Sequence, residues 1–211
     1  MAHPIITVEG NIGSGKTSLS ERLAKDLNAT LILETFADNP FLQKFFVRQQ
    51  DYALGMEMFF MAERYEQIKD AVPDWDQLQQ PVVIDYLFTK SLLYAQANLD
   101  EDEFHVFGKI FDILNPKLPT PDLIIYLHSN LDRLVANIHQ RGREFELTVK
   151  KDYLQKIEGQ YMRYFEQQPD CPVLLLDVSQ ADFVKQEIHY RQIHALMDRQ
   201  HQPGIHRYTI K

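Results

Sequence analysis

The sequence lacks several features that mark large classes of protein. Its 211 residues contain one cysteine, Cys171, so no internal disulfide can form. No apolar run approaches the roughly 20 residues that a membrane-spanning helix requires. Residues 1–6 also lack the basic and apolar regions of a secretory signal peptide. We therefore expect a cytoplasmic protein with no membrane partner.

Positive charge is also scarce. The chain has 22 lysines and arginines against 30 aspartates and glutamates, which gives a net charge of −8 at pH 7. Surfaces that coat nucleic acid are usually basic, so we expect no nucleic-acid partner. A small anionic ligand held by a few local cations is compatible with this balance.

Short apolar runs alternate with longer helical patterns, which is typical of a parallel sheet with covering helices. The expected strands, each rich in Val, Ile or Leu, are Ile5–Glu9, Thr30–Glu34, Val82–Asp85, Leu123–His128 and Val173–Asp177. The expected helices, each with apolar residues at helical spacing, are 18–27, 51–72, 129–138, 147–167 and 180–197. The sequence therefore predicts a single domain, residues 1–211, with a three-layer α/β fold and a five-stranded parallel sheet. The tail at 198–211 is expected either to be loose or to add a small edge element.

A phosphate-binding motif follows the first expected strand. Residues 10–17 read G-N-I-G-S-G-K-T and match G-x-x-x-x-G-K-[ST] without deviation. Glycines allow a tight loop whose backbone N–H groups point inward, and the following helix favours anionic oxygens at its N-terminus. Lys16 is expected to reach the β- and γ-phosphates of ATP, and Thr17 to offer its hydroxyl to Mg²⁺. The residues expected to bind ATP are Gly10, Asn11, Ile12, Gly13, Ser14, Gly15, Lys16, Thr17 and Ser18.

The rest of the sequence favours a small-molecule kinase among P-loop proteins. The D-x-x-G and N-K-x-D motifs that a GTPase needs do not occur in it. Arg141 and Arg143 flank a glycine at about 139–147, as in a lid that closes on phosphate oxygens, although a solvated basic turn is the alternative. Glu34 and Asp85 end two expected strands, where open α/β sheets bind their ligands. A carboxylate in that position can accept a hydroxyl proton or hold a metal ion.

Several motifs together resemble the deoxynucleoside kinase family of P-loop kinases, over nearly the whole chain. Besides the loop, they are Glu34 followed by D-N-P-F-L at 38–42, E-x-x-F-x-A-E-R-Y at 57–65, D-Y-x-F-x-K-S at 85–91 and R-G-R-x-x-E at 141–146. The forms at 38–42 and 85–91 are most similar to the bacterial members. The resemblance implies a P-loop kinase fold with an arginine-bearing lid and transfer of the γ-phosphoryl of ATP to the 5′-hydroxyl of a deoxynucleoside, with Mg²⁺. It also implies a homodimer, formed through the helices around 52–70 and 87–98.

The resemblance further implies a role for each matching residue. Glu34 is the implied general base, and Arg64 lies near both the substrate's base and this carboxylate. Arg141 and Arg143 are the implied catalytic arginines of the lid, acting with Lys16. Glu146 stands where family members hold the sugar 3′-hydroxyl.

The chain departs from the family pattern at some of these positions. Asp85 retains the acidic residue that the family has at this position. Its carboxylate, with Thr17, is expected to bind Mg²⁺ directly or through water. Tyr86, however, replaces an arginine that positions the 5′ end, and Lys90, one turn further on, can restore that charge. Phe46 stands near a family tyrosine that contacts the 3′-hydroxyl, which puts that contact in doubt.

Glu57 stands where many family members use a glutamine to read the base. An ionised carboxylate only accepts hydrogen bonds, so Glu57 favours a base that carries an amine. We expect deoxyadenosine first, deoxycytidine or deoxyguanosine as alternatives, and thymidine as the poorest fit. A pairing of Glu57 with Arg64 or with solvent is the competing interpretation. The aromatic residues that can stack on a base, of which one or two are expected to do so, are Phe41, Phe45, Phe46, Tyr52 and Phe88.

Two other functions stay open on the sequence alone. One is a kinase of another small acceptor such as a nucleoside monophosphate, against which the acidic Glu57 and Glu146 argue. The other is a non-catalytic ATP-binding regulator, against which Glu34 and both lid arginines argue. The favoured reaction yields a 5′-monophosphate and belongs to nucleotide salvage.

Overall fold

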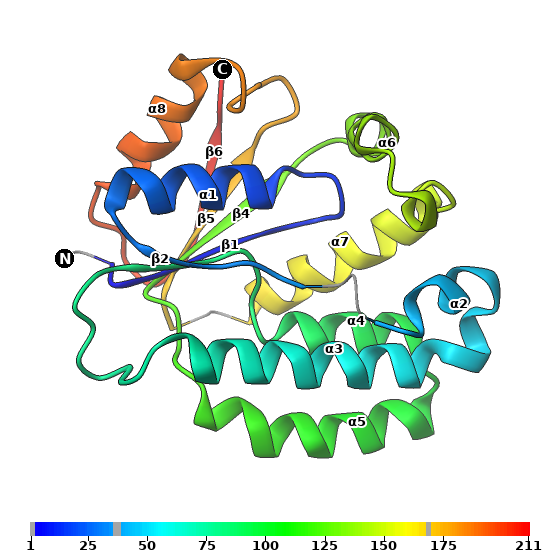
Figure 1. The fold of residues 1–211 in the computed structure, drawn as a ribbon. Helices are drawn as coiled ribbons and strands as arrows, with labels where there is room; N and C mark the ends of the chain where they lie inside the picture. The colour runs from blue at the N-terminus through cyan, green and yellow to red at the C-terminus, as the bar shows by residue number, and fades with distance from the viewer. Residues whose placement is uncertain (1–2, 36–38, 168–169) are drawn as a thin grey trace.

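A six-stranded parallel sheet runs through the centre of the protein (Figure 1). The computed structural model describes residues 3–35, 39–167 and 170–211. The strand order is β2-β3-β1-β4-β5-β6, and all neighbouring strands are parallel. The strands are β1 (Ile5–Gly10), β2 (Thr30–Ile32), β3 (Val82–Ile84), β4 (Leu123–His128), β5 (Pro172–Asp177) and β6 (Gly204–Thr209).

The continuous apolar runs of the central strands follow from burial on both faces. Every residue of β1 and β3 is buried, and β4 and β5 are buried up to their last residues. Parallel strands covered by helices on both sides require this composition, because neither face meets water. Val8 of β1 pairs in register with Ile125 of β4, and both side chains belong to one core cluster.

Helices α1 (Lys16–Leu27) and α8 (Glu187–Met197) cover one face of the sheet, above it in Figure 1. Their buried residues, such as Leu23 and Ile193, pack with Val8 and its neighbours in that cluster. Because α1 begins directly after the phosphate loop, this packing fixes the loop against the sheet.

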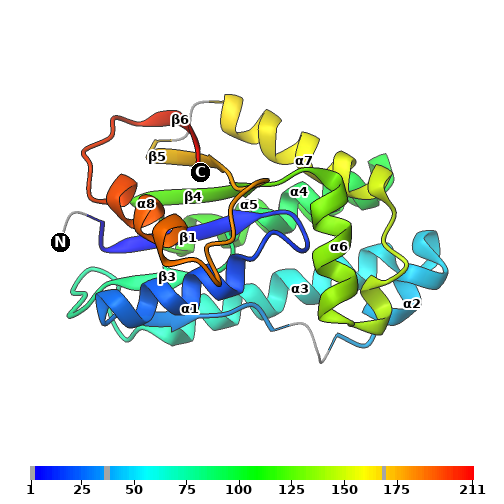
Figure 2. The same cartoon turned by 90° about the horizontal axis from the view of Figure 1, so that it is seen from above.

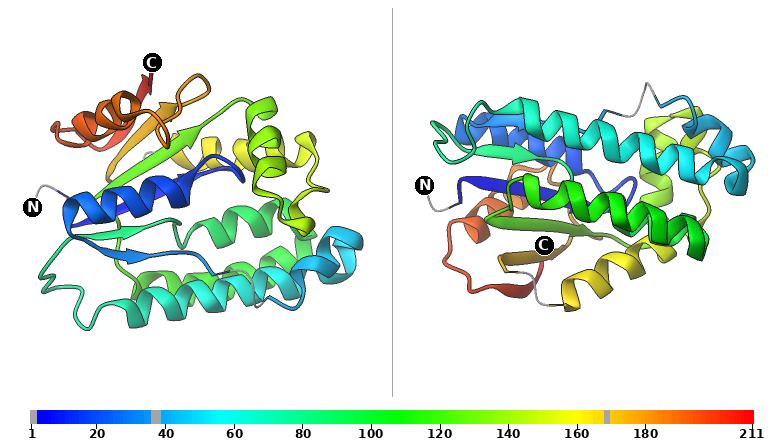
Figure 3. Two further views of the ribbon diagram at one scale, coloured as in Figure 1. Left: turned by 45° about the horizontal axis from the view of Figure 1, so that its top comes forward. Right: turned by 90° about the horizontal axis from the view of Figure 1, so that it is seen from below.

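The other face is covered by α3 (Gln49–Ala71), α4 (Lys90–Asn98), α5 (Glu101–Leu114) and α7 (Lys151–Glu166). Figure 3 shows this face from below, with α3 in cyan, α5 in green and α7 in yellow. Met61 of α3 and Phe111 of α5 pack under β3, and Tyr161 of α7 packs under β4. Among the residues that the sequence predicts to bind the substrate, Glu57 and Arg64 lie on α3 and Lys90 lies on α4.

Shorter helices lie beyond the carboxyl ends of the strands, as Figure 2 shows for α2 and α6. They are α2 (Leu42–Val47), α6 (Leu131–Arg141) and the 3-10 helix η2 (Glu144–Glu146), while a second 3-10 helix, η1 (Asn115–Lys117), follows α5. Asn130 caps α6, because its side chain accepts a hydrogen bond from the backbone N–H of Arg133.

The prediction of five strands is wrong by one strand. The C-terminal tail adds β6 at the edge, next to β5, so the edge-element alternative for residues 198–211 is confirmed. Strands β2 and β3 end before Glu34 and Asp85, although the Asp85 backbone N–H still donates to the Ile32 carbonyl at 3.0 Å. The side chains of both acids bind groups beyond the sheet. Helices α7 and α8 begin later than predicted, since a turn occupies residues 147–150 and a loop with turns occupies residues 180–186.

Helix α4 lies between α3, α5 and α7 and has little free surface. Within α4, which the structure describes completely, Gln96 is the one exposed residue. The homodimer remains a prediction. An interface formed through residues 87–98 would have little exposed surface of α4 available, because Gln96 is its one exposed residue. None of the helices in the described ranges combines the length and apolar character needed to cross a bilayer.

The last strand generates a stability prediction. Ile210 follows β6 and is 1% exposed within the cluster formed by α1 and α8, and its backbone N–H donates to the Asp177 carbonyl at 3.0 Å. We expect Ile210→Ala to lower the unfolding free energy by about 2–5 kcal/mol, because it leaves a cavity in the core. Urea denaturation measures the change. The exposed neighbour Thr209 provides the control, since Thr209→Ala should stay within about 0.5 kcal/mol of the parent. Equal effects of the two changes would contradict the docking of the tail.

Candidate active site

The phosphate loop connects β1 to α1 and depends on its glycines. Gly13 has φ +81° and Gly15 has φ +94°, which are backbone conformations that side chains rarely allow. A Cβ on Gly13 would also lie 2.7 Å from the Leu134 carbonyl oxygen, and one on Gly15 would lie 2.8 Å from Phe183 Cζ. The loop therefore packs directly against α6 and against the segment after β5.

Lys16 folds back over this loop. Its Nζ donates to the carbonyl oxygens of Gly10 at 2.9 Å and Asn11 at 3.0 Å. Burial and the nearby Lys90 lower the pKa of Lys16 to about 8, although Glu9, Glu34 and Asp85 oppose the shift. The ammonium is thus held against the loop carbonyls, with both positively and negatively charged side chains nearby.

Asp85 joins the loop to the ends of two strands. Its Oδ2 accepts a hydrogen bond from Thr17 Oγ1 at 2.8 Å, and its Oδ1 accepts one from the Glu34 backbone N–H at 2.7 Å. The hydroxyl and the carboxylate are both oxygen ligands of the kind that Mg²⁺ prefers. Thr17 and Asp85 therefore fit the metal role that the sequence predicts, side by side at the start of α1.

Glu34 is held between two cations. Its Oε1 accepts hydrogen bonds from Arg64 Nε at 2.9 Å and Nη2 at 2.5 Å, and its Oε2 accepts one from Lys90 Nζ at 2.6 Å. Burial alone would raise the pKa of Glu34, but Lys90 and Arg64 outweigh it and hold that pKa well below its usual range. The carboxylate is therefore ionised throughout the physiological pH range.

Tyr86, the departure next to Asp85, points away from this cluster into the core. It is fully buried, and its hydroxyl donates to Gln67 Oε1 at 2.9 Å. The charge beside Glu34 comes instead from Lys90, which is 4% exposed in the first turn of α4. A helix thus supplies the cation that the turn after β3 lacks.

The two lid arginines converge on one carboxylate. Helix α6 ends at Gly142, whose φ of +71° turns the chain into η2. Glu146 in η2 accepts hydrogen bonds from Arg141 Nη2 and from Arg143 Nη1, the latter at 3.3 Å. Arg141 is exposed and Arg143 is half-buried, so both guanidinium groups contact the buried Glu146 while they remain in reach of solvent.

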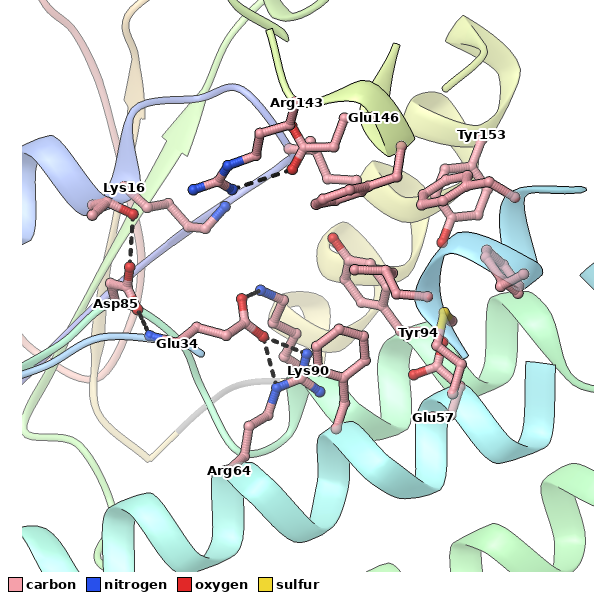
Figure 4. Close-up of a pocket in the computed structure, with 18 of the residues that line it drawn as sticks. Lys16, Glu34, Glu57, Arg64, Asp85, Lys90, Tyr94, Arg143, Glu146 and Tyr153 are labelled. Carbon is pink, nitrogen blue, oxygen red and sulfur yellow. Dashed lines mark hydrogen bonds and ion pairs between the residues drawn. The ribbon is translucent and has the colours of Figure 1, made fainter. Parts of the chain in front are cut away.

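Two cavities meet at the loop. One, of about 540 Å³, is lined by residues 13–18, by α6 and by residues 178–185. The other, of about 120 Å³, extends from Lys16 and Asp85 to Glu57 and is shown in Figure 4. Lys16, Thr17, Arg141 and Arg143 line both cavities. The residues that the sequence predicts to bind phosphate therefore stand at the boundary between the larger and the smaller cavity.

The far end of the smaller cavity is built from α2, α3, α4 and α7. Glu57 is 1% exposed there, and its Oε1 accepts a hydrogen bond from Asn98 Nδ2 at 2.6 Å. The competing interpretation, a pairing of Glu57 with Arg64 or solvent, is therefore wrong. Burial raises the pKa of Glu57 to about 7, against the lowering effects of Asn98 and Arg64.

The structure separates the aromatic candidates. Phe45 and Phe46 line the smaller cavity, and Phe46 stacks against Phe145 of the lid with ring centroids 6.3 Å apart. Phe88 stacks instead on Phe111 in the core at 5.2 Å. In the motif at 38–42, Asp38 lies outside the described residues, whereas Asn39 donates to the Met56 carbonyl.

Sequence reasoning missed several residues that line these cavities. Tyr94 and Tyr153 border the smaller one, and Arg133 borders the larger one, where it donates to the Ser179 and Ala181 carbonyls. The two tyrosines stand on helices among ordinary core residues, and no motif includes Arg133, so no local pattern distinguishes them. Asn98 is a polar residue at the end of an apolar helix, which is a weak signal that could have been noticed.

Comparison with known proteins decides the family. The sequence profile of deoxynucleoside kinases matches residues 6–201. The chain belongs to the deoxynucleoside kinase family. It is therefore a transferase that phosphorylates a hydroxyl group with ATP as donor, and the two alternative functions are set aside.

Individual relatives agree with this family. Deoxyguanosine kinase of Bacillus subtilis (strain 168) is 33% identical over 196 residues, which cover 91% of this chain and 95% of that protein. Deoxyadenosine/deoxycytidine kinase of the same organism is 29% identical over 190 residues, which cover 87% and 86%. The structure of deoxyadenosine kinase from M. mycoides with bound dATP is similar in fold, with a TM-score of 0.78 at 18% identity, covering 93% of this chain and 100% of that one.

The setting of Lys16 predicts an alkaline limit to activity. As the pH rises through about 8, Lys16 loses its charge in the free enzyme and its attraction for phosphate oxygens. We expect kcat/KM for ATP to fall by roughly tenfold per pH unit above that point. Lys16→Arg, which keeps its charge, should remove the decline even if its activity is lower. A kcat/KM for ATP that stays constant to pH 10 would contradict the assignment.

Proposed function

We propose that this deoxynucleoside kinase transfers the γ-phosphoryl of ATP to the 5′-hydroxyl of a deoxynucleoside with an amine-bearing base, in nucleotide salvage. Deoxyadenosine is the favoured substrate, with deoxycytidine and deoxyguanosine as alternatives. The observation that carries the proposal is one cavity with different carboxyl groups at its two ends, Glu34 beside the phosphate loop and Glu57 at the far end (Figure 4).

Glu34 is suited to receive the 5′-hydroxyl. Its ionised carboxylate can accept the hydroxyl's hydrogen bond and orient the oxygen toward the phosphoryl group. Because Arg64 and Lys90 hold its pKa low, Glu34 is a weak base, so the proton moves to it late, as the new P–O bond forms. The two cations keep the carboxylate in place during this step.

The donor side uses the phosphate loop and the lid. Backbone N–H groups of the loop and Lys16 would hold the phosphates of ATP, and Thr17 and Asp85 would hold Mg²⁺, which when bound neutralises charge on the phosphates. Arg141 and Arg143 line both cavities and can stabilise the charge that develops on the transferred group. Glu146 orients both guanidinium groups and lies where it can also accept a hydrogen bond from the sugar 3′-hydroxyl, beside Phe46 and Phe145.

The position of Glu57 supports a contact with the base. Its carboxyl lies at the end of the cavity opposite Lys16, so a nucleoside whose 5′-hydroxyl meets Glu34 directs its base toward α3 and α4. The ionised form accepts hydrogen bonds and so selects amines.

The single-domain organisation and the homodimer are part of the same proposal.

The role of Glu34 leads to a direct test. We expect Glu34→Gln to retain ATP binding but to lose about 10²-fold or more in kcat, because the amide cannot take the hydroxyl proton. Steady-state turnover and ATP affinity should be measured together. The exposed residue Glu66, on the same α3 helix as Arg64, supplies the matched control Glu66→Gln, which should behave as the parent. Near-parental turnover of Glu34→Gln would remove Glu34 from the base role.

The substrate assignment is tested by phosphorylation rates for the four common deoxynucleosides with purified protein at pH 8. We expect activity on deoxyadenosine, or on another amine-bearing base, to exceed that on thymidine by at least about tenfold, which is the worth of one hydrogen bond to a charged acceptor. A preference for thymidine would contradict the role of Glu57 and leave the kinase activity intact.

A further inference from the structure

Glu57 combines deep burial with an incomplete set of hydrogen bonds. It lies in the middle of α3, and its Oε1 accepts the Asn98 amide at 2.6 Å. No donor among the described residues reaches its Oε2, which is shielded from solvent. A buried acceptor without a partner is costly, which points to a ligand that completes it. The cavity that Glu57 lines is where such a ligand would lie.

Asn98 holds the other oxygen through a network across three helices. Its Nδ2, at the end of α4, is 2.6 Å from Glu57 Oε1 on α3 and 3.1 Å from the Tyr153 hydroxyl on α7. Both amide hydrogens therefore have acceptors. Gln49 Nε2 donates to Asn98 Oδ1 at 3.3 Å, which agrees with the orientation of the amide that the Glu57 carboxylate requires. Asn98 thus presents a donor, and not its carbonyl oxygen, to Glu57.

We propose that Asn98 is a positioning residue that reserves Oε2 of Glu57 for the base and makes that oxygen the site of protonation. Glu57 then accepts a hydrogen bond from the base when it is ionised and donates one to the base when it is protonated. This inference rests on the proposed function, because it refines how the same cavity selects its nucleoside.

The chemistry of a carboxyl group links the two parts of this proposal. Because Oε1 already accepts a hydrogen bond from Asn98, a proton on Glu57 is placed on Oε2, where the acid becomes an O–H donor. The charged and titratable groups facing Glu57 are Arg64 of α3, Lys90 of α4, Glu34 after β2 and Tyr153 of α7. Their balance with burial gives Glu57 a pKa of about 7. Both forms are therefore present near neutral pH.

The two forms prefer different base edges. Adenine offers both an amine and the ring acceptor N1, so it can bind either form. Purine without the 6-amine offers only acceptors at that edge, so it can bind the protonated form alone. The preference for deoxyadenosine over purine 2′-deoxyriboside should therefore rise as the pH increases and Glu57 ionises.

The experiment measures kcat/KM for these two nucleosides between pH 6 and 8.5. For the parent enzyme we expect their ratio to rise by about tenfold or more, with a midpoint near pH 7. In Glu57→Gln the amide presents a permanent N–H donor in place of Oε2, so the ratio should be low and independent of pH. A ratio that still depends on pH in Glu57→Gln would overturn the proposal.

Asn98→Ala tests the positioning role itself. Loss of its hydrogen bond to the carboxylate should shift the midpoint of the ratio to higher pH and reduce the discrimination at pH 8, because either oxygen can then carry the proton. Gln96→Ala, at the exposed position of the same helix, is the matched control and should reproduce the parent profile. If Asn98 were merely structural, its variant would lose activity on both nucleosides equally with an unmoved midpoint, and the proposal would be wrong.

Failure of this inference differs from failure of the proposed function. If the parent phosphorylates both nucleosides with a ratio that is flat between pH 6 and 8.5, the switch at Glu57 is refuted and the kinase assignment stands. If no deoxynucleoside is phosphorylated at any of these pH values, both are wrong.

Discussion

The site depends on one largely buried carboxylate held by two cations. Glu34 sits between Arg64 of α3 and Lys90 of α4, and its backbone N–H is held by Asp85. A charge shielded from water is tolerated when it is paired, so removal of both cations would leave the carboxylate uncompensated. The pairing therefore fixes the chain after β2 relative to α3 and α4, which cover one face of the sheet. The smaller cavity takes its shape from this arrangement.

Two glutamates in one cavity have opposite electrostatic settings. Glu34 is largely buried and has two cations as partners, which keep it ionised. Burial raises the pKa of Glu57 to about 7, because its one hydrogen-bond donor, the neutral Asn98 amide, offsets only part of the shift. Groups whose environments push their pKa values apart are suited to different tasks in one active site. In the proposed function the ionised group receives the reacting hydroxyl, and the titrating group contacts the base.

Much of the fold could be predicted from local patterns. The phosphate loop, the first strand and the central strands β4 and β5 are continuous apolar runs or fixed motifs, and the structure has them where they are expected. Strand β6 could not be assigned, because Gly204–Thr209 contains polar residues and forms a strand only by pairing with the edge of β5. The contact between Asn98 and Glu57 joins residues 41 positions apart, so it depends on how α3 and α4 pack. Likewise, the sequence presents Arg141, Arg143 and Glu146 together but does not show that the acid holds both arginines.

A crystal structure of the protein with deoxyadenosine, grown at pH 8, tests the central claim most directly. The account predicts the 5′-hydroxyl within hydrogen-bonding distance of Glu34 and the adenine 6-amine at Oε2 of Glu57, with Asn98 still donating to Oε1. A nucleoside bound with its base toward the phosphate loop, or with Glu57 turned away from it, would contradict the account.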